Sequence, residues 1–356
     1  MGKHIPCKGE YKLMFVPVKT KDGQQLMPLH AARARKLIKR SEATPYWNNG
    51  IYCIRLNKEP SDRDIQDIVV GVDPGSKKEG FTVKSEKHTY LNVQVDAHSH
   101  VSKKVAKRRE LRRNRRSRKC PNRKNRMNRL ANKERIPAGT RARWDWKLRI
   151  LHWLSNLYPI RHVCVEDIKA PTIERAKKWN TSFSPLEVGK QWFYSEIRKR
   201  WELLTLQGWQ TKEIRERLGL KKSSEKMSET FDAHCVDNWC LAYHSVGGAN
   251  IPDNTDIFCI APIPIKRRCL HREQEAKGGQ RNRYGGTVLG NGLIKNTLIK
   301  HVNYGLTRLA GVNAKGLFSI YNLAGNKRLT TSAKRNSFTI LTRLNFNYRS
   351  GHSSPS

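Results

Sequence analysis

One short stretch constrains the fold more than any other: the apolar run Ile68-Val69-Val70-Gly71-Val72, which ends at Asp73 and is followed by Pro74-Gly75. A continuous apolar run that stops at turn residues is typical of a strand buried on both faces of a sheet. A carboxylate at the end of such a strand costs free energy unless it is paired. We therefore expect Asp73 to meet a cation, for which a metal ion is the natural candidate. An ordinary aspartate that caps the turn is the alternative.

The two segments after Asp73 also have strand character. Gly75 and Gly80 flank a tight turn into Phe81-Thr82-Val83-Lys84, and residues 90–95 alternate between apolar and polar side chains, as a half-buried strand does. Two hairpin-linked strands that follow a buried strand with an acid at its tip resemble the opening of the RNase H-like nuclease fold and its first RuvC motif. The resemblance implies an α/β fold.

Two later segments place acids in a comparable way. Residues 160–165 indicate a second central strand, which again ends in acids, Glu166 and Asp167. His234 and Asp237 are three residues apart and would share one face of a helix, although such a pair is more often an ordinary surface pair. In this order the segments resemble the second and third RuvC motifs, which implies that Glu166 is a ligand. Whether Asp167 or Asp232 assists is left open.

The three acids together suit the hydrolysis of a phosphodiester. Asp73, Glu166 and Asp237 could hold two Mg²⁺ ions roughly 4 Å apart, which would stabilise the attacking and the leaving oxygen. Carboxylate oxygens favour Mg²⁺ or Mn²⁺ over zinc. His234 would activate or orient the attacking water, or protonate the leaving group.

The most biased part of the chain lies between the first and second acids. Residues 101–136 hold 17 Lys and Arg against Glu110 and Glu134, and no Gly or Pro interrupts residues 101–120. Arg and Lys are good helix formers, so we expect a helix that has almost no apolar face; a disordered basic segment is the alternative. The stretch resembles the arginine-rich bridge helix of RNA-guided nucleases, which implies RNA binding by Arg108, Arg109, Arg112, Arg113, Arg115, Arg116, Arg118 and Lys119.

The charge of the whole chain points to the same class of partner. The formal net charge of +40 arises from 70 Lys and Arg against 30 Asp and Glu, which implies a polyanion. Nine Trp and eleven Tyr among the cations would suit base stacking, although the tryptophans of residues 144–154 have the spacing of a packed amphipathic helix. No membrane association is expected, since no apolar run approaches the 18 or more residues of a spanning helix. The protein is expected in the cytoplasm.

Two terminal regions resemble parts of one family. Leu26-Met27-Pro28, followed by a basic helix over residues 31–40, resembles the PLMP segment of IscB and IsrB proteins, with Gln25 where the family has its first proline. Residues 267–286 are rich in Gly and Arg and also resemble these proteins, although a flexible linker is the alternative. The resemblance implies nucleic-acid contacts by Arg268, His271, Lys277, Arg281 and Arg283, and a β-rich C-terminal domain that reads a short target-adjacent motif.

An absence distinguishes the relatives. IscB carries an HNH nuclease, which needs histidine, between the second and third RuvC motifs, but residues 163–233 contain no histidine. The chain therefore resembles IsrB, which implies an RNA-guided nickase. A non-coding guide RNA (omega RNA) would pair with the target strand, and the single nuclease centre would cut the non-target strand of double-stranded DNA. The protein would be a monomer in a ribonucleoprotein.

The expected domains are 1–66 (PLMP), 67–98 (RuvC part I), 99–136 (bridge helix), 137–262 (RuvC parts II and III) and 263–356 (C-terminal domain).

Several expectations remain beside this interpretation. The eight cysteines include no Cys-x-x-Cys pair, so a zinc module is not expected. The linking region should contain helices over residues 192–204 and 211–218, the second stopped by Gly219. The alternatives to an RNA-guided nickase are an RNase H-like resolvase or transposase that acts without RNA, a catalytically silent nucleic-acid-binding protein, and a ribosome-associated RNA-binding protein.

Overall fold

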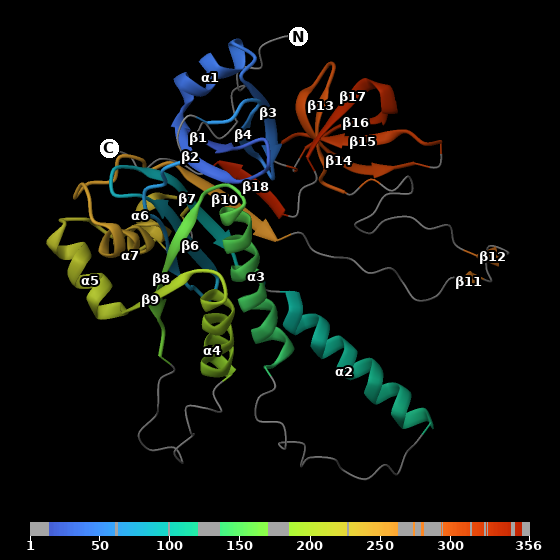
Figure 1. Ribbon diagram of the computed structural model, residues 1–356. Coiled ribbons are helices and arrows are strands. Elements are labelled where there is room, and N and C mark those ends of the chain that lie inside the picture. The colour runs from blue at the N-terminus through green and yellow to red at the C-terminus, as the bar shows by residue number, and fades with distance from the viewer. Residues whose placement is uncertain are drawn as a thin grey trace, which may run out of the picture. The chain divides into compact units, whose positions relative to one another are not determined.

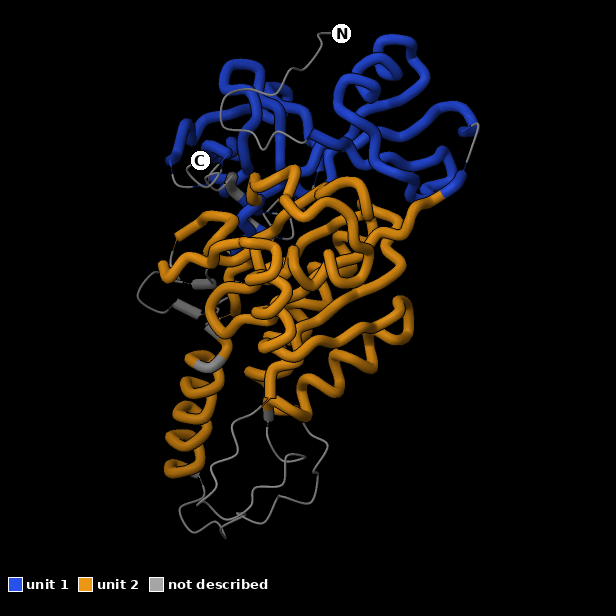
Figure 2. Tube along the Cα trace, turned by 90° about the vertical axis from the view of Figure 1, so that its left-hand side faces the viewer, with its two compact units in different colours: residues 1–64, 258–351 blue, residues 65–257, 352–356 orange. Residues whose placement is uncertain are grey.

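The computed structural model divides the chain into two compact units, residues 1–64 with 258–351 and residues 65–257 with 352–356 (Figure 2). The described residues are 14–60, 63–98, 100–119, 136–169, 185–225, 228–262, 273–274, 279–280, 293, 295–313, 315–323, 325, 327–342 and 346–350. No helix within these ranges is long and apolar enough to cross a membrane.

The second unit is built on five strands in the order β7-β6-β5-β8-β9 (Figure 1). Strands β5, β6 and β7 form an antiparallel meander, and β8 and β9 continue the sheet parallel to β5. In chain order this sequence is 3-2-1-4-5, and β6 alone of these five strands runs opposite to the others. The expected α/β class is therefore confirmed. The strands are β5 (Ile68–Asp73), β6 (Lys78–Lys84), β7 (Thr89–Asp96), β8 (Ile160–Asp167) and β9 (Glu202–Gln207).

Strand β5 forms the centre of this sheet because its residues suit burial on both faces. Every residue from Ile68 to Val72 is buried, and the β-branched side chains fit a pleated surface covered from both sides.

The helices that the structure describes in this unit are α2 (His100–Lys119), α3 (Ala138–Ser155), α4 (Pro185–Arg198), α5 (Gly208–Arg217), α6 (Phe231–His234) and α7 (Val236–Val246). In α3 the side chains of Trp144, Trp146 and Trp153 are buried, so their predicted role in packing is confirmed.

The linking region differs from its prediction. The helix expected over residues 192–204 ends at Arg198, and Glu202–Gln207 forms the edge strand β9 instead. This segment pairs in parallel with β8, whose free edge supplies hydrogen-bond partners that no local pattern reveals. The next helix begins at Gly208 rather than at residue 211, and Gly219, with φ of 69°, follows its end as predicted.

Among the described residues, the first unit contains two sheets and two strand pairs. A four-stranded sheet in the order β2-β1-β4-β3 supports α1 (Ala31–Lys39), which confirms the basic helix predicted for this region. Its strands are β1 (Phe15–Lys19), β2 (Gln25–His30), β3 (Ala43–Asn48) and β4 (Ile51–Leu56). Strand β10 (Ile257–Pro262) pairs with β18 (Phe346–Ser350), and two residues each form β11 (Glu273–Gln274) and β12 (Gly279–Gln280).

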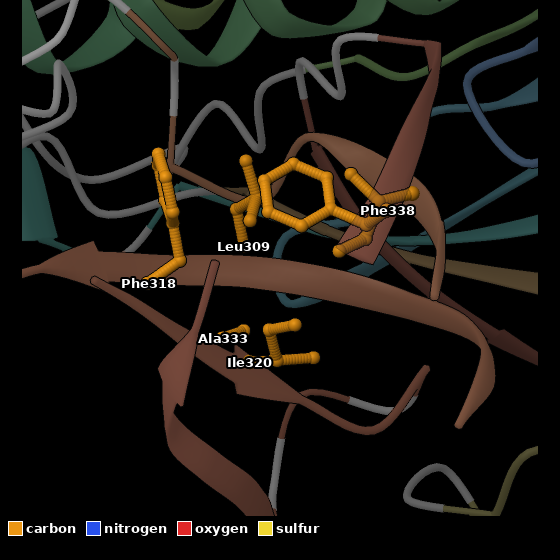
Figure 3. Close-up of a cluster of buried hydrophobic side chains, with 6 residues drawn as sticks. Leu309, Phe318, Ile320, Ala333 and Phe338 are labelled. Atoms are coloured by element: carbon orange, nitrogen blue, oxygen red, sulfur yellow. The ribbon is translucent and has the colours of Figure 1, made fainter. Parts of the chain in front are cut away.

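The second sheet of this unit has its own hydrophobic core. Its five strands follow the order β16-β15-β14-β13-β17, and Figure 3 shows side chains of the cluster formed by Ile299, Leu309, Phe318, Ile320, Ala333 and Phe338. The rings of Phe318 and Phe338 meet edge to face, 5.1 Å apart. The elements are β13 (Leu298–His301), β14 (Gly305–Val312), β15 (Phe318–Tyr321), β16 (Arg328–Ala333), the 3₁₀ turn η3 (Arg335–Ser337) and β17 (Phe338–Thr342).

Candidate active site

The first two predicted acids lie at the ends of neighbouring parallel strands. Asp73 is the last residue of β5, and Glu166 is the last residue but one of β8. The two strands pair in parallel, with Val72 opposite Val165. The next residue of each strand is therefore Asp73 and Glu166, which lie side by side at one edge of the sheet.

The side chains of Asp73 and Glu166 lie close enough together to share a hydrogen bond. Burial, together with the charge of Asp73, raises the pKa of Glu166 to about 8. Burial and the nearby Asp237 raise the pKa of Asp73, and the hydrogen bond from Glu166 opposes that rise. Two carboxyls held this close cannot both ionise cheaply unless a cation joins them.

Glycine at position 208 leaves room beside Glu166. A Cβ added at Gly208, the first residue of α5, would lie 2.8 Å from Glu166 Oε1. Any larger residue would press against this oxygen. The main chain at the start of α5 therefore borders the acidic pair directly.

The third acid reaches the site through a close approach of helix and sheet. Asp237 lies in the first turn of α7 and is buried. A Cβ added at Gly71 of β5 would collide with the carbonyl oxygen of Asn238, and one added at Gly80 of β6 would collide with the carbonyl oxygen of His234. The two glycines let the backbones of α6 and α7 touch the sheet, which brings Asp237 to the strand that carries Asp73.

A buried chain of hydrogen bonds fixes α7 in this place. Asn238 Nδ2 donates to Thr82 Oγ1 over 2.6 Å, and Thr82 Oγ1 donates to Asn92 Oδ1 over 2.8 Å. The next residue of the helix, Trp239, donates from Nε1 to Thr89 Oγ1 over 2.9 Å. These bonds join the helix to β6 and β7, so the position of Asp237 is set by the whole sheet.

Two cations hold Asp237, and the sequence did not indicate either of them. Arg215 of α5 donates to Asp237 Oδ1, and Lys222 donates to Asp237 Oδ2. Although burial alone would lower the pKa of Lys222, Asp237 raises it. Arg215 and Lys222 are two of many cations in a segment predicted only to link helices, so their spacing gave no signal.

A second unpredicted pair is buried close to Asp73. Lys147 Nζ of α3 donates to Glu79 Oε1 of β6 over 2.7 Å, and both side chains are buried. The other carboxylate oxygen, Glu79 Oε2, has no hydrogen-bond partner among the described residues. Burial raises the pKa of Glu79, an effect that Lys147 opposes and that the charge of Asp73 increases. The acids are thus surrounded by charges from α3 (Lys147), α5 (Arg215), the segment after α5 (Lys222) and the sheet (Glu79).

His234 and Asp237 do not share one helix, contrary to the prediction. Helix α6 ends at His234, and α7 starts only at Val236. The break falls at Cys235, whose φ of −114° departs from the usual helical value near −63°. Two short helices can each follow the sheet surface where one straight helix could not. The role of His234 in catalysis stays a prediction.

Asp167, one of the two additional acids considered, is bound by side chains of neighbouring elements of the fold. Its carboxylate lies 2.7 Å from Lys190 Nζ and accepts hydrogen bonds from Tyr194 Oη and Gln207 Nε2. Burial would raise the pKa of Asp167, but these three hydrogen bonds lower it instead. The side chain therefore joins β8, α4 and β9. Asp232 lies on α6 and is half-buried.

The predicted RNA-binding helix is confirmed as a helix. Helix α2 runs over 20 residues from His100 to Lys119, and the arginines from Arg108 to Arg118 are all exposed. Lys119 ends the helix. The remainder of the predicted bridge segment, residues 120–135, lies outside the described residues. So do all five residues predicted to bind nucleic acid in the C-terminal loop: Arg268, His271, Lys277, Arg281 and Arg283.

The donor set suits a hard metal ion at the Asp73–Glu166 pair. A divalent cation bound by both carboxyl groups would neutralise their repulsion, and carboxylate oxygens are the ligands that Mg²⁺ and Mn²⁺ prefer. Asp237 is bound to Arg215 and Lys222. In accordance with this, the described residues include no group of three or more His, Cys, Asp or Glu side chains already placed around one metal position.

Comparison with known proteins gives one family match. A family model described as "RRXRR protein" matches residues 16–178. This range contains Arg112-Arg113-Asn114-Arg115-Arg116, a run with the spacing of that description. It includes Asp73, Glu166 and α2 and ends before Asp237. No curated protein matches the chain.

Among solved structures, the chain is similar to RuvC of Thermus thermophilus. One structure is RuvC in complex with a Holliday junction substrate, with 17% identity, a TM-score of 0.26, and 51% of this chain and 97% of that chain covered. A second RuvC structure has 17% identity, a TM-score of 0.25, and 51% and 98% covered.

Proposed function

We propose that the protein is a metal-dependent endonuclease that binds a non-coding guide RNA and nicks the non-target strand of duplex DNA next to a short target-adjacent motif. The placement of Asp73 and Glu166 at the ends of two parallel strands, with Asp237 brought to them by α7, carries the nuclease part of this proposal. An acidic cluster at the edge of an RNase H-like sheet suits phosphodiester hydrolysis and little else in a protein of such positive charge.

The guide RNA is proposed from a different part of the chain. Helix α2 presents exposed arginines on a helix without an apolar face, and arginine forks suit bidentate contacts to phosphate. The resemblance of the chain to IsrB proteins adds that the polyanion is a guide RNA and that a single centre cuts one strand.

Within the site, each residue has a proposed part. Asp73, Glu166 and Asp237 would hold two Mg²⁺ ions, for which Mn²⁺ could substitute. Such ions stabilise the attacking and leaving oxygens of the phosphodiester. Arg215 and Lys222 orient the Asp237 carboxylate and supply positive charge where a phosphate would enter. His234 would orient the attacking water or protonate the leaving group.

The test uses protein purified with its co-expressed neighbouring non-coding RNA, a supercoiled plasmid with a guide-matched site, and Mg²⁺. We expect nicked circles that depend on the match. Asp73→Asn should slow nicking by about a thousandfold or more, because the substitution removes a metal-ligand charge, and it should leave RNA binding unchanged. Asp67→Asn is the matched control, since Asp67 is exposed and paired with Arg161.

Four results would change the proposal. Full-rate nicking by Asp73→Asn would remove Asp73 from the site. Linear product would indicate a second cut, and cleavage of branched DNA without RNA would favour a resolvase. Bound RNA without cleavage would leave a nucleic-acid-binding protein.

A further inference from the structure

Lys222 places a positive charge among the three acids of the site. Its ammonium group contacts Asp237 Oδ2, while Arg215 contacts the other oxygen of that carboxylate. Burial raises the pKa of both Asp73 and Glu166, and the charge of Lys222 opposes this rise in each of them. One lysine thus acts on all three carboxyl groups, which is the electrostatic role of a metal ion in such a site.

The two cations bound to Asp237 are held in different ways. Arg215 belongs to α5, which packs against α7 (Figure 1), and its side chain is only 16% exposed. Lys222 lies in the segment after that helix, and its side chain is 42% exposed. An arginine fork is planar and directional, whereas a lysine is a point charge on a flexible stem. The lysine is therefore the cation that can leave the carboxylate without moving a helix.

The main chain on both sides of Lys222 is fixed by hydrogen bonds. Leu220 N donates to Arg215 O over 3.0 Å. On the other side, Ser223 N donates to Asp232 O, also over 3.0 Å. These bonds tie the segment to α5 before Lys222 and to α6 after it. Loss of the ion pair therefore requires movement of the lysine side chain and leaves the main chain in place.

Lys222 and a metal ion would share Asp237 as a binding partner. A divalent cation and an ammonium group on the same carboxylate repel each other. From these contacts we infer that Lys222 is an exchangeable counter-ion: its ammonium group and a divalent metal ion compete for Asp237, while Arg215 stays bound. The inference rests on the proposed nuclease function, to which it adds that Lys222 sets the metal concentration at which the site fills.

The first test measures metal binding without any cleavage. The full-length protein, free of RNA, is titrated with Mn²⁺, and the unbound ion is followed by electron paramagnetic resonance. Lys222→Met should bind Mn²⁺ about tenfold more tightly than the wild-type protein, because the competing cation is absent. Lys222→Arg keeps a cation for Asp237 and should bind no more tightly than the wild type. Lys221→Met is the matched control, since it removes the same charge from an exposed neighbour, and it should match the wild type.

The second test follows the ammonium group of Lys222 in the wild-type protein. Reductive methylation labels lysines in an ion pair slowly, because a nearby carboxylate favours the unreactive charged form, and mass spectrometry of peptides locates the label. Saturating Mn²⁺ should speed the labelling of Lys222 by at least about fivefold, since the ion shifts the population toward the released side chain. The labelling of Lys221 should not change.

The outcomes separate this inference from the proposed nuclease. Equal Mn²⁺ affinity of the wild type and Lys222→Met, or labelling of Lys222 that Mn²⁺ does not change, would overturn the exchange while the metal site remains. Equally tight binding by Lys221→Met and Lys222→Met would also overturn it, because general charge rather than the contact with Asp237 would then be responsible. No binding of Mn²⁺ by any of these proteins would count against the metal site and the nuclease, and against the exchange with them.

Discussion

Helices α2 and α7 belong to the same unit but are stabilised in opposite ways. In α7 every residue from Val236 to Ala242 is buried, and its backbone touches the sheet at Gly71. In α2 the arginines are exposed, and even the apolar Leu111 is 58% exposed. Helix α7 is held by contacts within the protein, whereas α2 contacts α3 but exposes every residue from 106 to 118. The comparison indicates that α2 acts toward a partner outside the chain.

The charges of α2 make this contrast sharper. Arg108 and Arg112, Arg109 and Arg113, and Arg112 and Arg116 are each four residues apart, and like charges at this spacing destabilise a helix. A polyanion would convert each of these repulsions into an attraction. Experiments on the two helices can test whether a polyanion stabilises α2 while the protein itself stabilises α7.

Neutralising one face of α2 should weaken RNA binding without harming the fold. For Arg112, Arg113, Arg115 and Arg116 changed together to Gln, we expect about a thousandfold lower affinity for guide RNA at low salt. The slope of log affinity against log salt should fall by about 3, because four phosphate contacts are lost. The melting temperature of the RNA-free protein should stay the same or rise. Filter binding over a salt series and thermal melting measure these effects.

The control for this variant is a second basic helix. Arg33, Arg35, Lys36 and Lys39 of α1 are exposed, and their change to Gln removes the same charge. If both fourfold variants lose equal affinity, the effect reflects overall charge rather than α2.

Filling the close contact between α7 and β5 should destabilise the fold, whereas neutralising α2 should not. Gly71→Ala places a Cβ against the Asn238 carbonyl, so the free energy of unfolding should fall by about 3 kcal/mol. Gly139→Ala in α3 is the matched control, because its Cβ would meet no atom within 4 Å. It should leave stability unchanged or raise it by up to about 1 kcal/mol. Urea unfolding provides the measurement, and a stable Gly71→Ala protein would contradict the close approach.

The rates of amide hydrogen exchange should differ between α2 and α7. In the RNA-free protein the amides of α2 should exchange much faster than those of α7, because few contacts oppose their opening. Guide RNA should slow exchange in α2 by at least about tenfold and leave α7 nearly unchanged. Slow exchange in α2 without RNA would show that the protein itself orders this helix.

The pair Asp73 and Glu166 should make the stability of the metal-free protein depend on pH, which is a smaller effect. Because burial and Asp73 raise the pKa of Glu166 to about 8, the folded protein keeps a proton that the unfolded chain releases at its ordinary pKa. The resulting stability is complete below the ordinary carboxyl pKa and is lost as the pH rises through about 8. Metal-free protein should therefore melt at lower temperature as the pH increases over this window. Glu166→Gln should flatten the dependence, and Glu213→Gln, at an exposed position of α5, should not.

Much of the architecture could be predicted because it depends on local patterns. The run Ile68–Val72 has the composition of a doubly buried strand and is one, and the uninterrupted Arg-rich stretch is helical. Strand β9 could not be predicted, because Glu202–Gln207 has no strong period of its own. Its conformation depends on the parallel edge of β8.

The sequence by itself determined which residues could be candidates: three acids that each follow a buried segment or begin a helix, and one helix too basic to pack. Only the tertiary structure decided what surrounds them. The adjacency of Asp73 and Glu166 arises from strand register, and the position of Asp237 from glycines on two strands. Its partner Arg215 lies on a helix that starts after an unforeseen strand, and its partner Lys222 lies on the segment that follows this helix. Periodicity reports which side of an element is buried, but it carries no information about which distant element covers that side.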